Sequence, residues 1–158
     1  MNRHRLTSWV PFALVLLLAT ATTPEEKKSM KVARGTFDVK VAPIALDGPE
    51  ANLLFGRFSL EKQLHGDLEA TGRGQMLTAG TEVKTSAAYV AIERVDGTLA
   101  GRLGSFALQH RGTMTAAAQR LEITVVPDSG TGQLVGLEGT FKVIIEGGKH
   151  SYEFEYDL

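Results

Sequence analysis

The sequence contains no cysteine. This absence excludes disulfide bonds, catalytic thiolates, cysteine-ligated zinc and a lipid-modified N-terminal cysteine. The chain also has almost no net charge, because 17 Lys and Arg residues nearly balance 18 Asp and Glu residues. This balance gives no electrostatic reason to expect nucleic acid or an anionic membrane surface as a partner. Hydrophobic residues make up 43% of the 158 positions, which is typical of one packed domain.

The first 21 residues are typical of a signal peptide. Two arginines give a positively charged start, and an uncharged apolar run follows over residues 9–18. Ala19-Thr20-Ala21 has the small-x-small pattern that signal peptidase recognises, so we predict cleavage after Ala21, with Ala19 as the alternative. The apolar run is short for a helix that spans a bilayer, although an uncleaved N-terminal anchor is the competing interpretation.

The predicted organisation has three parts. They are a signal peptide over residues 1–21, a flexible polar linker over residues 22–31 and one folded domain over residues 32–158. We expect export to the periplasm or the medium, with no stable membrane anchor after cleavage.

The folded part alternates apolar and polar residues with period two, which predicts strands with one buried face. Phe37, Val39 and Val41, for example, alternate with charged residues. Only residues 79–87 and 130–137 have room for a short helical turn. We expect eight strands, over residues 32–42, 53–64, 68–78, 87–99, 104–115, 119–127, 137–146 and 150–157. Such strands, joined by glycine-rich turns, predict an all-β fold: a single closed or nearly closed eight-stranded antiparallel β-barrel.

Short motifs are spread over this whole domain. They are KQLHGDLE at residues 62–69, YVAIER at 89–94, GRLGSF at 101–106, QH at 109–110, VPDSGTG at 126–132 and GKHSY at 148–152. Together they resemble the bacterial family known as domain of unknown function 3224. The resemblance covers residues 32–158 and implies a barrel similar to allene oxide cyclase and dirigent proteins. Residues 130–139 are similar to a glycine-rich loop of those barrels. The resemblance implies no reaction and supplies no catalytic residue.

Familiar catalytic motifs do not fit. The glycine-rich segment 130–139 lacks the Lys-Ser/Thr of a phosphate-binding loop, and Ser129 lies in no nucleophile elbow. His65, His110 and His150 do not have the spacing of a zinc site, so a metal could only be held by residues from distant strands. We expect no metal and no cofactor.

The turn at residues 101–104 sets how two strands pair. If Arg102 and Leu103 are its central residues, Glu93 faces Gly112 and lies diagonally from His110 on one face. That face also carries larger apolar side chains, so we expect it to line the barrel lumen. We predict a lumen lined by Tyr89, Glu93, Leu99, Phe106, Leu108, His110, His150 and Tyr152.

Three functions stay open. The barrel binds a small apolar ligand; or it is a cofactor-free isomerase or cyclase in which Glu93, His110 and Tyr89 are catalytic; or it is a ligand-free interaction or structural protein. In the last case the Glu93 and His110 side chains form a buried polar network.

Two surface features complete the expectations. Val90 and Ile92 point outward in this register, which favours a homo-oligomer. Lys62 and Glu69 flank the Gly66-Asp67 turn and are expected to face one another, as a surface ion pair or as a ligand contact at the barrel mouth.

Overall fold

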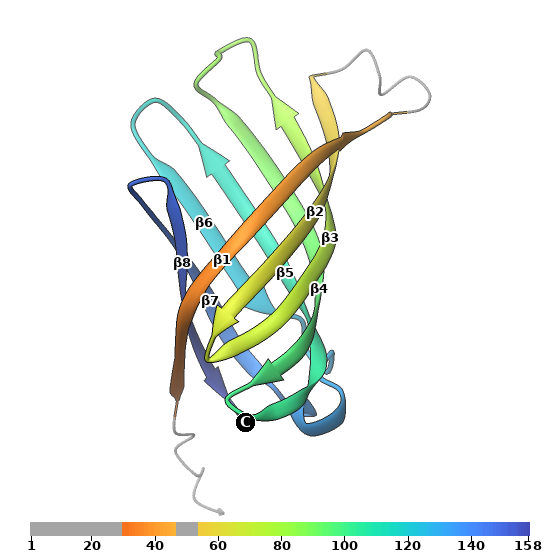
Figure 1. The fold of residues 1–158 in the computed structure, drawn as a ribbon. Coiled ribbons are helices and arrows are strands. Elements are labelled where there is room, and N and C mark those ends of the chain that lie inside the picture. Colours follow the sequence, from red (N-terminus) through yellow and green to blue (C-terminus); the bar gives the residue numbers. More distant parts are fainter. Residues whose placement is uncertain (1–29, 47–53) are drawn as a thin grey trace, which may run out of the picture.

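The computed structural model describes residues 30–46 and 54–158, so the predicted signal peptide and nearly all of the linker lie outside the described residues. The strands are β1 (Lys31–Ile44), β2 (Phe55–Gly66), β3 (Leu68–Gly80), β4 (Ala87–Leu99), β5 (Arg102–Met114), β6 (Gln119–Val125), β7 (Glu138–Glu146) and β8 (Lys149–Asp157). Each strand pairs antiparallel with the next, and β1 pairs with β8 to close the barrel (Figure 1). The predicted eight-stranded barrel is confirmed.

Helical structure is minimal in the described part of the chain. A single 3-10 turn, η2 (Gly132–Leu134), lies between β6 and β7, inside the segment 130–137 that the sequence left room for. Among the same residues, no helix is long and apolar enough to cross a membrane.

The period-two pattern separates an inner from an outer face. In β4, Ala91, Glu93 and Val95 are buried, whereas Val90 and Ile92, which alternate with them, are exposed. This alternation is what a strand with one face toward a packed interior requires. The outward orientation predicted for Val90 and Ile92 is therefore confirmed.

The hairpin between β4 and β5 turns at Ala100 and Gly101, not at Arg102 and Leu103 as predicted. Both turn residues have positive φ, 47° and 82°, as a tight two-residue hairpin requires. Gly104 is not a turn residue and has a different role. A side chain at this position would overlap the backbone oxygen of Thr131, so only glycine allows the two segments to come this close. The corrected register pairs Glu93 with Leu108 instead of Gly112. The shift is even, so every side chain keeps its predicted face.

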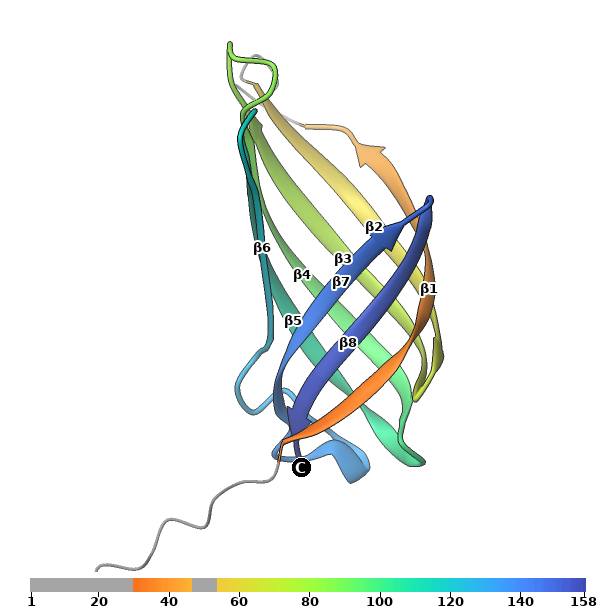
Figure 2. The same ribbon diagram turned by 90° about the vertical axis from the view of Figure 1, so that its left-hand side faces the viewer.

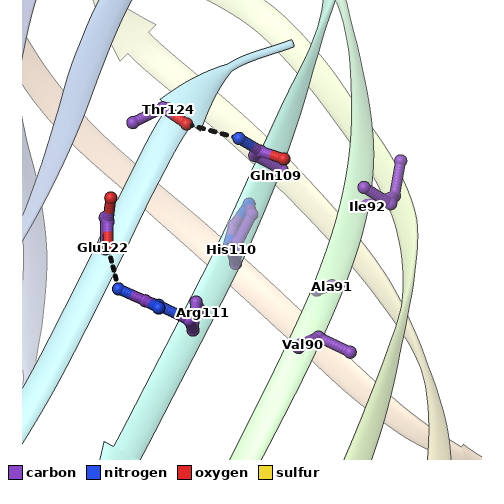
Figure 3. A pocket seen from close by; sticks show the side chains of 8 residues that line it. All are labelled: Val90, Ala91, Ile92, Gln109, His110, Arg111, Glu122 and Thr124. Carbon is purple, nitrogen blue, oxygen red and sulfur yellow. Dashed lines mark hydrogen bonds and ion pairs between the residues drawn. The ribbon is translucent and has the colours of Figure 1, made fainter.

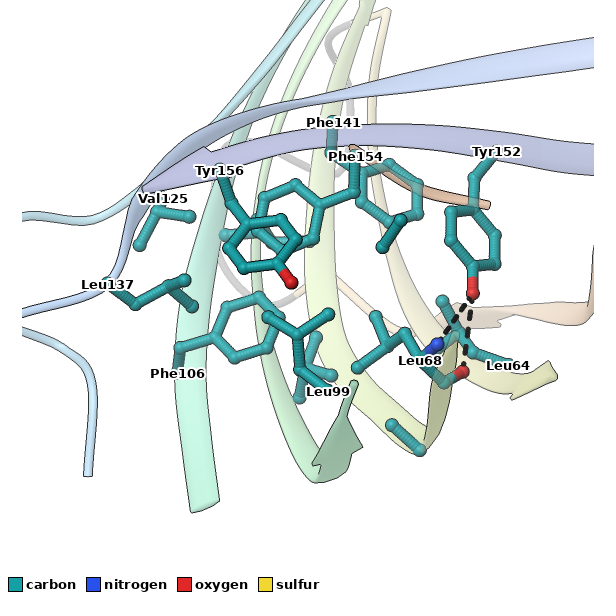
Figure 4. Close-up of a cluster of buried hydrophobic side chains, with 14 of the residues drawn as sticks. Leu64, Leu68, Leu99, Phe106, Val125, Leu137, Phe141, Tyr152, Phe154 and Tyr156 are labelled. Carbon is teal, nitrogen blue, oxygen red and sulfur yellow. Dashed lines mark hydrogen bonds between the residues drawn. The ribbon is translucent and has the colours of Figure 1, made fainter. Parts of the chain in front are cut away.

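One end of the barrel is filled by side chains (Figure 4). Phe106 and Phe154 stack with ring centroids 5.7 Å apart, and Leu134 of η2 inserts fully buried against this core. The hydroxyl of Tyr152 accepts a hydrogen bond from the Leu68 backbone N–H at 2.9 Å. These contacts close the barrel at the end that holds the β2–β3 and β4–β5 turns.

The opposite end is open. Inward-facing side chains there remain partly exposed, including Met114 at 39% and Leu121 at 47%. The wall also loosens, because β6 and β7 share only the pair Thr124–Thr140, and the two strands diverge above it (Figure 2). The barrel is thus a cup with a packed base and an accessible mouth.

Candidate functional site

Three ionisable side chains meet inside the barrel between its packed base and its mouth. Lys62 Nζ donates a hydrogen bond to Glu93 Oε2 at 2.6 Å, and His110 Nε2 lies 3.1 Å from the same oxygen. Glu93 is 0% exposed and His110 6% exposed. We call these residues the buried ionic cluster.

A glycine allows the cluster to form. Lys62 is on β2 and Glu93 is on β4, so β3 lies between them. Gly72 of β3 pairs with Lys62, and a Cβ at this position would overlap Glu93 Oε1. The missing side chain leaves the space in which the carboxylate reaches the lysine.

The cluster keeps Glu93 ionised. Burial by itself would raise the pKa of Glu93, but the neighbouring His110 ring and the positive charge of Lys62 lower it by more, so the net shift is downward. Two aromatic rings also surround the lysine, whose Nζ lies 5.4 Å from the Phe37 ring centroid and 6.0 Å from that of Phe141. Lys62 is thus held by one carboxylate and two aromatic faces.

Two polar atoms of the cluster are left without hydrogen bonds. Glu93 Oε1 and His110 Nε2 are buried and have no hydrogen-bond partner among the described residues. His110 Nε2 is close enough to Glu93 Oε2 for an ion pair, but the contact does not have the direction of a hydrogen bond. Buried polar atoms in native proteins normally form hydrogen bonds with protein, water or ligand, so we expect a water molecule or a ligand to bind these two atoms.

A pocket of about 400 Å³ lies on the inner wall of the open end, next to the cluster. Its inward-facing lining consists of Met76, Thr78, Ala87, Tyr89, Gly112, Met114, Gln119 and Leu121. The Tyr89 ring lies against Gly112, where a Cβ would overlap it, and burial raises the pKa of the Tyr89 phenol. Gly112 is two residues from His110 on the same face of β5, so the pocket and the cluster occupy adjacent layers.

The predicted lining residues divide among four places. Glu93 and His110 lie together in the cluster, and Tyr89 lines the pocket. His150 packs against Phe37 with ring centroids 5.1 Å apart and the two rings tilted by 39°. The remaining four are packed in the buried core: Leu99, Phe106, Leu108 and Tyr152.

Lys62 is a member of the site that was not predicted from the sequence. The prediction that Lys62 faces Glu69 is wrong. Glu69 is exposed and accepts hydrogen bonds from the Gly66 N–H at 2.7 Å and from His65. The period of two in this strand could have indicated its orientation. Lys62 lies two residues after the buried Leu60 and two residues before the buried Leu64, so all three side chains are on one face. The lysine therefore had to face inward.

The outer wall carries a separate groove of about 470 Å³ across β4, β5 and β6 (Figure 3). Val90 and Ile92 form one side of it, and an Arg111–Glu122 ion pair at 2.6 Å forms the other. The side chain of His110 points away from this groove into the barrel. The groove is thus unconnected with the chemistry of the cluster. No group of three or more His, Cys, Asp or Glu side chains within residues 30–46 and 54–158 is arranged to hold a metal ion.

Comparisons with known proteins match nearly the whole described domain. A family model described as "Protein of unknown function (DUF3224)" matches residues 33–156. A solved structure of a protein with unknown function from the DUF3224 family of Shewanella oneidensis MR-1 is 48% identical to this chain. The two structures superpose with a TM-score of 0.77, and the match covers 82% of this chain and 98% of the Shewanella chain. No curated protein matches the sequence.

Proposed function

We propose that this chain, which belongs to the DUF3224 family, has a binding function. The ligand is a small, largely apolar molecule, and it is held in the open end of the barrel. The observation that carries the proposal is the asymmetry of the interior. One end is filled by buried aromatic and aliphatic side chains, whereas the other has an apolar pocket on its inner wall. A barrel that served only as a rigid scaffold would have no need of an unfilled half.

The pocket has the size and character of a small-molecule site. Its volume of about 400 Å³ lies in the range of ligand pockets, and Met76, Met114 and Leu121 give it an apolar wall. The neutral phenol of Tyr89, the Thr78 hydroxyl and the Gln119 amide add polar groups that can orient a ligand. Methionine side chains adapt their shape, which suits a pocket that closes around an apolar guest.

We infer that a ligand enters from the mouth of the barrel or through the gap between β6 and β7. A second pocket, of about 300 Å³, lies where β6 and β7 diverge, between Leu121 and Ile123 on one strand and Val143 on the other. We propose that binding takes place outside the cytoplasm, which rests on the signal peptide predicted for residues 1–21.

The competing function is a cofactor-free isomerase or cyclase that uses Glu93, His110 and Tyr89. The 3.1 Å contact between Glu93 and His110 favours it, because the two groups could exchange a proton. However, the pKa of Glu93 is lowered by His110 and Lys62, which makes its carboxylate a weak general base. Binding is the function that the geometry supports better.

Fluorescence of a neutral apolar probe, N-phenyl-1-naphthylamine, tests the proposal. We expect saturable binding to the wild type and its loss in Met114→Trp, because the larger ring fills the inner pocket. The matched control is Ile92→Trp, which places the same ring on the outer wall and should bind normally. Equal binding by both variants would show that the inner pocket is not the site.

A further inference from the structure

The buried ionic cluster and the pocket next to it narrow the chemical class of the ligand. This step rests on the proposed function, since it concerns a ligand held in that pocket. Glu93 Oε1 and His110 Nε2 are the two cluster atoms that lack hydrogen-bond partners among the described residues. The other carboxylate oxygen, Oε2, is already bonded to Lys62.

The proton positions follow from charge and distance. Glu93 is ionised and offers Oε1 as a hydrogen-bond acceptor. His110 Nε2 lies 3.1 Å from the carboxylate oxygen Oε2, whose negative charge favours the ring tautomer with its hydrogen on Nε2, and this N–H does not point along the contact, so it is free to donate to another group. The cluster therefore presents one free acceptor and one free donor, close together because Oε1 and Oε2 share a carbon atom.

Few chemical groups satisfy both atoms. A carbonyl accepts from His110 but has nothing to donate to Oε1. An ammonium donates but cannot accept, and it would meet the positive charge of Lys62. A carboxylate would be repelled by Glu93. A neutral hydroxyl both donates and accepts through one oxygen.

We propose that the buried ionic cluster binds a single hydroxyl group, and that the ligand is an apolar alcohol or phenol. Its O–H donates to Glu93 Oε1, and its oxygen accepts the hydrogen of His110 Nε2. The apolar part of the ligand lies in the pocket beside Met76 and Met114. The hydroxyl reaches the cluster by displacing the Tyr89 ring, which lies against Gly112 between the two.

A matched pair of probes tests this proposal: 2-naphthol and 2-methylnaphthalene, which have nearly the same shape and differ in the hydroxyl. The wild type should bind 2-naphthol about tenfold more tightly or better, as a hydrogen bond to a charged group predicts. In Glu93→Gln the preference should fall to less than about twofold, because the charged acceptor is lost. Glu122→Gln, which alters a carboxylate on the outer wall, should keep the full preference.

The outcomes separate this proposal from the proposed function. If the wild type binds both naphthalenes equally, the pocket is a ligand site but the cluster takes only water, and the hydroxyl proposal is wrong. If N-phenyl-1-naphthylamine binds and neither naphthalene does, the hydroxyl proposal is again wrong. If no probe binds, the proposed function fails, and the hydroxyl proposal fails with it.

A second measurement needs no variant, so it serves if Glu93→Gln does not fold. The ¹⁵N resonance of His110 Nε2 in the wild type should move on saturation with 2-naphthol and stay in place with 2-methylnaphthalene. Equal movement with both compounds would contradict a hydrogen bond to the hydroxyl.

Discussion

Lys62 donates a hydrogen bond to Glu93 at 2.6 Å even though a whole strand, β3, separates the strands that carry them. The bond is possible because Gly72 of β3 has no side chain to stand in the way. Three strands therefore cooperate in one buried ion pair, and each contribution can be tested separately.

The substitution Gly72→Ala should destabilise the fold. A methyl group at this position overlaps Glu93 Oε1 and lies tight against Lys62, so the carboxylate must move in a packed interior. We expect a loss of about 1–3 kcal/mol in the free energy of unfolding, measured by urea denaturation. The control is Thr71→Ala on the adjacent position, which should change it by about 0.5 kcal/mol or less. An unchanged midpoint for Gly72→Ala would contradict the arrangement.

Removing only the lysine should cost more than removing the pair. Lys62→Met leaves the Glu93 carboxylate buried without a cation, and we expect a loss of about 3–5 kcal/mol. The double variant Lys62→Met/Glu93→Leu removes both charges and should recover most of that loss. A double variant as unstable as the sum of its two single variants would show that the charges do not interact.

The stability of the wild type should fall in acid because of Glu93. Its folded pKa is lowered from the ordinary value of 4.5, so its stabilising contribution is complete above that pH and is lost as the pH falls through the folded pKa. The difference in free energy of unfolding between wild type and Glu93→Gln should therefore shrink below about pH 4.5. A difference that stays constant from pH 7 to pH 3 would be inconsistent with a lowered pKa.

The turn at Ala100 and Gly101 offers a stabilising substitution. Ala100 has a φ of 47°, which alanine adopts unwillingly, and asparagine followed by glycine is the preferred sequence for such a turn. Ala100→Asn should raise the free energy of unfolding by about 0.5–1 kcal/mol. Leu103→Asn, inside β5, should give no such gain, because this position is a strand residue and not part of the turn. The reverse ranking would favour the turn at Arg102 and Leu103.

The sequence predicted most of the fold because period-two alternation is a local signal. It placed Glu93 and His110 on the inner face, and it did so despite a misplaced turn, since the shift in register was even. The position of the turn itself was missed because Gly104 was interpreted as a turn residue, whereas it makes room for Thr131, which is distant in sequence. Such close approaches between distant segments leave no local pattern.

The site was less predictable than the fold. Lys62 could have been assigned to the inner face by its alternation with Leu60 and Leu64, but its partner Glu93 lies 31 residues away and across another strand. The division of the interior into a packed base and an open mouth depends on how η2 inserts Leu134 and where β6 leaves β7. Neither follows from the spacing of residues along one strand.

The most direct test of ligand binding in the open end uses the methionine methyl groups. Met76 and Met114 both line the inner pocket, whereas Met30 lies just before β1 and is absent from the pocket wall. In a sample labelled with ¹³C at the methionine methyls, titration with N-phenyl-1-naphthylamine should shift the Met76 and Met114 resonances together and leave Met30 in place. Saturable binding that moves neither Met76 nor Met114 would contradict the account.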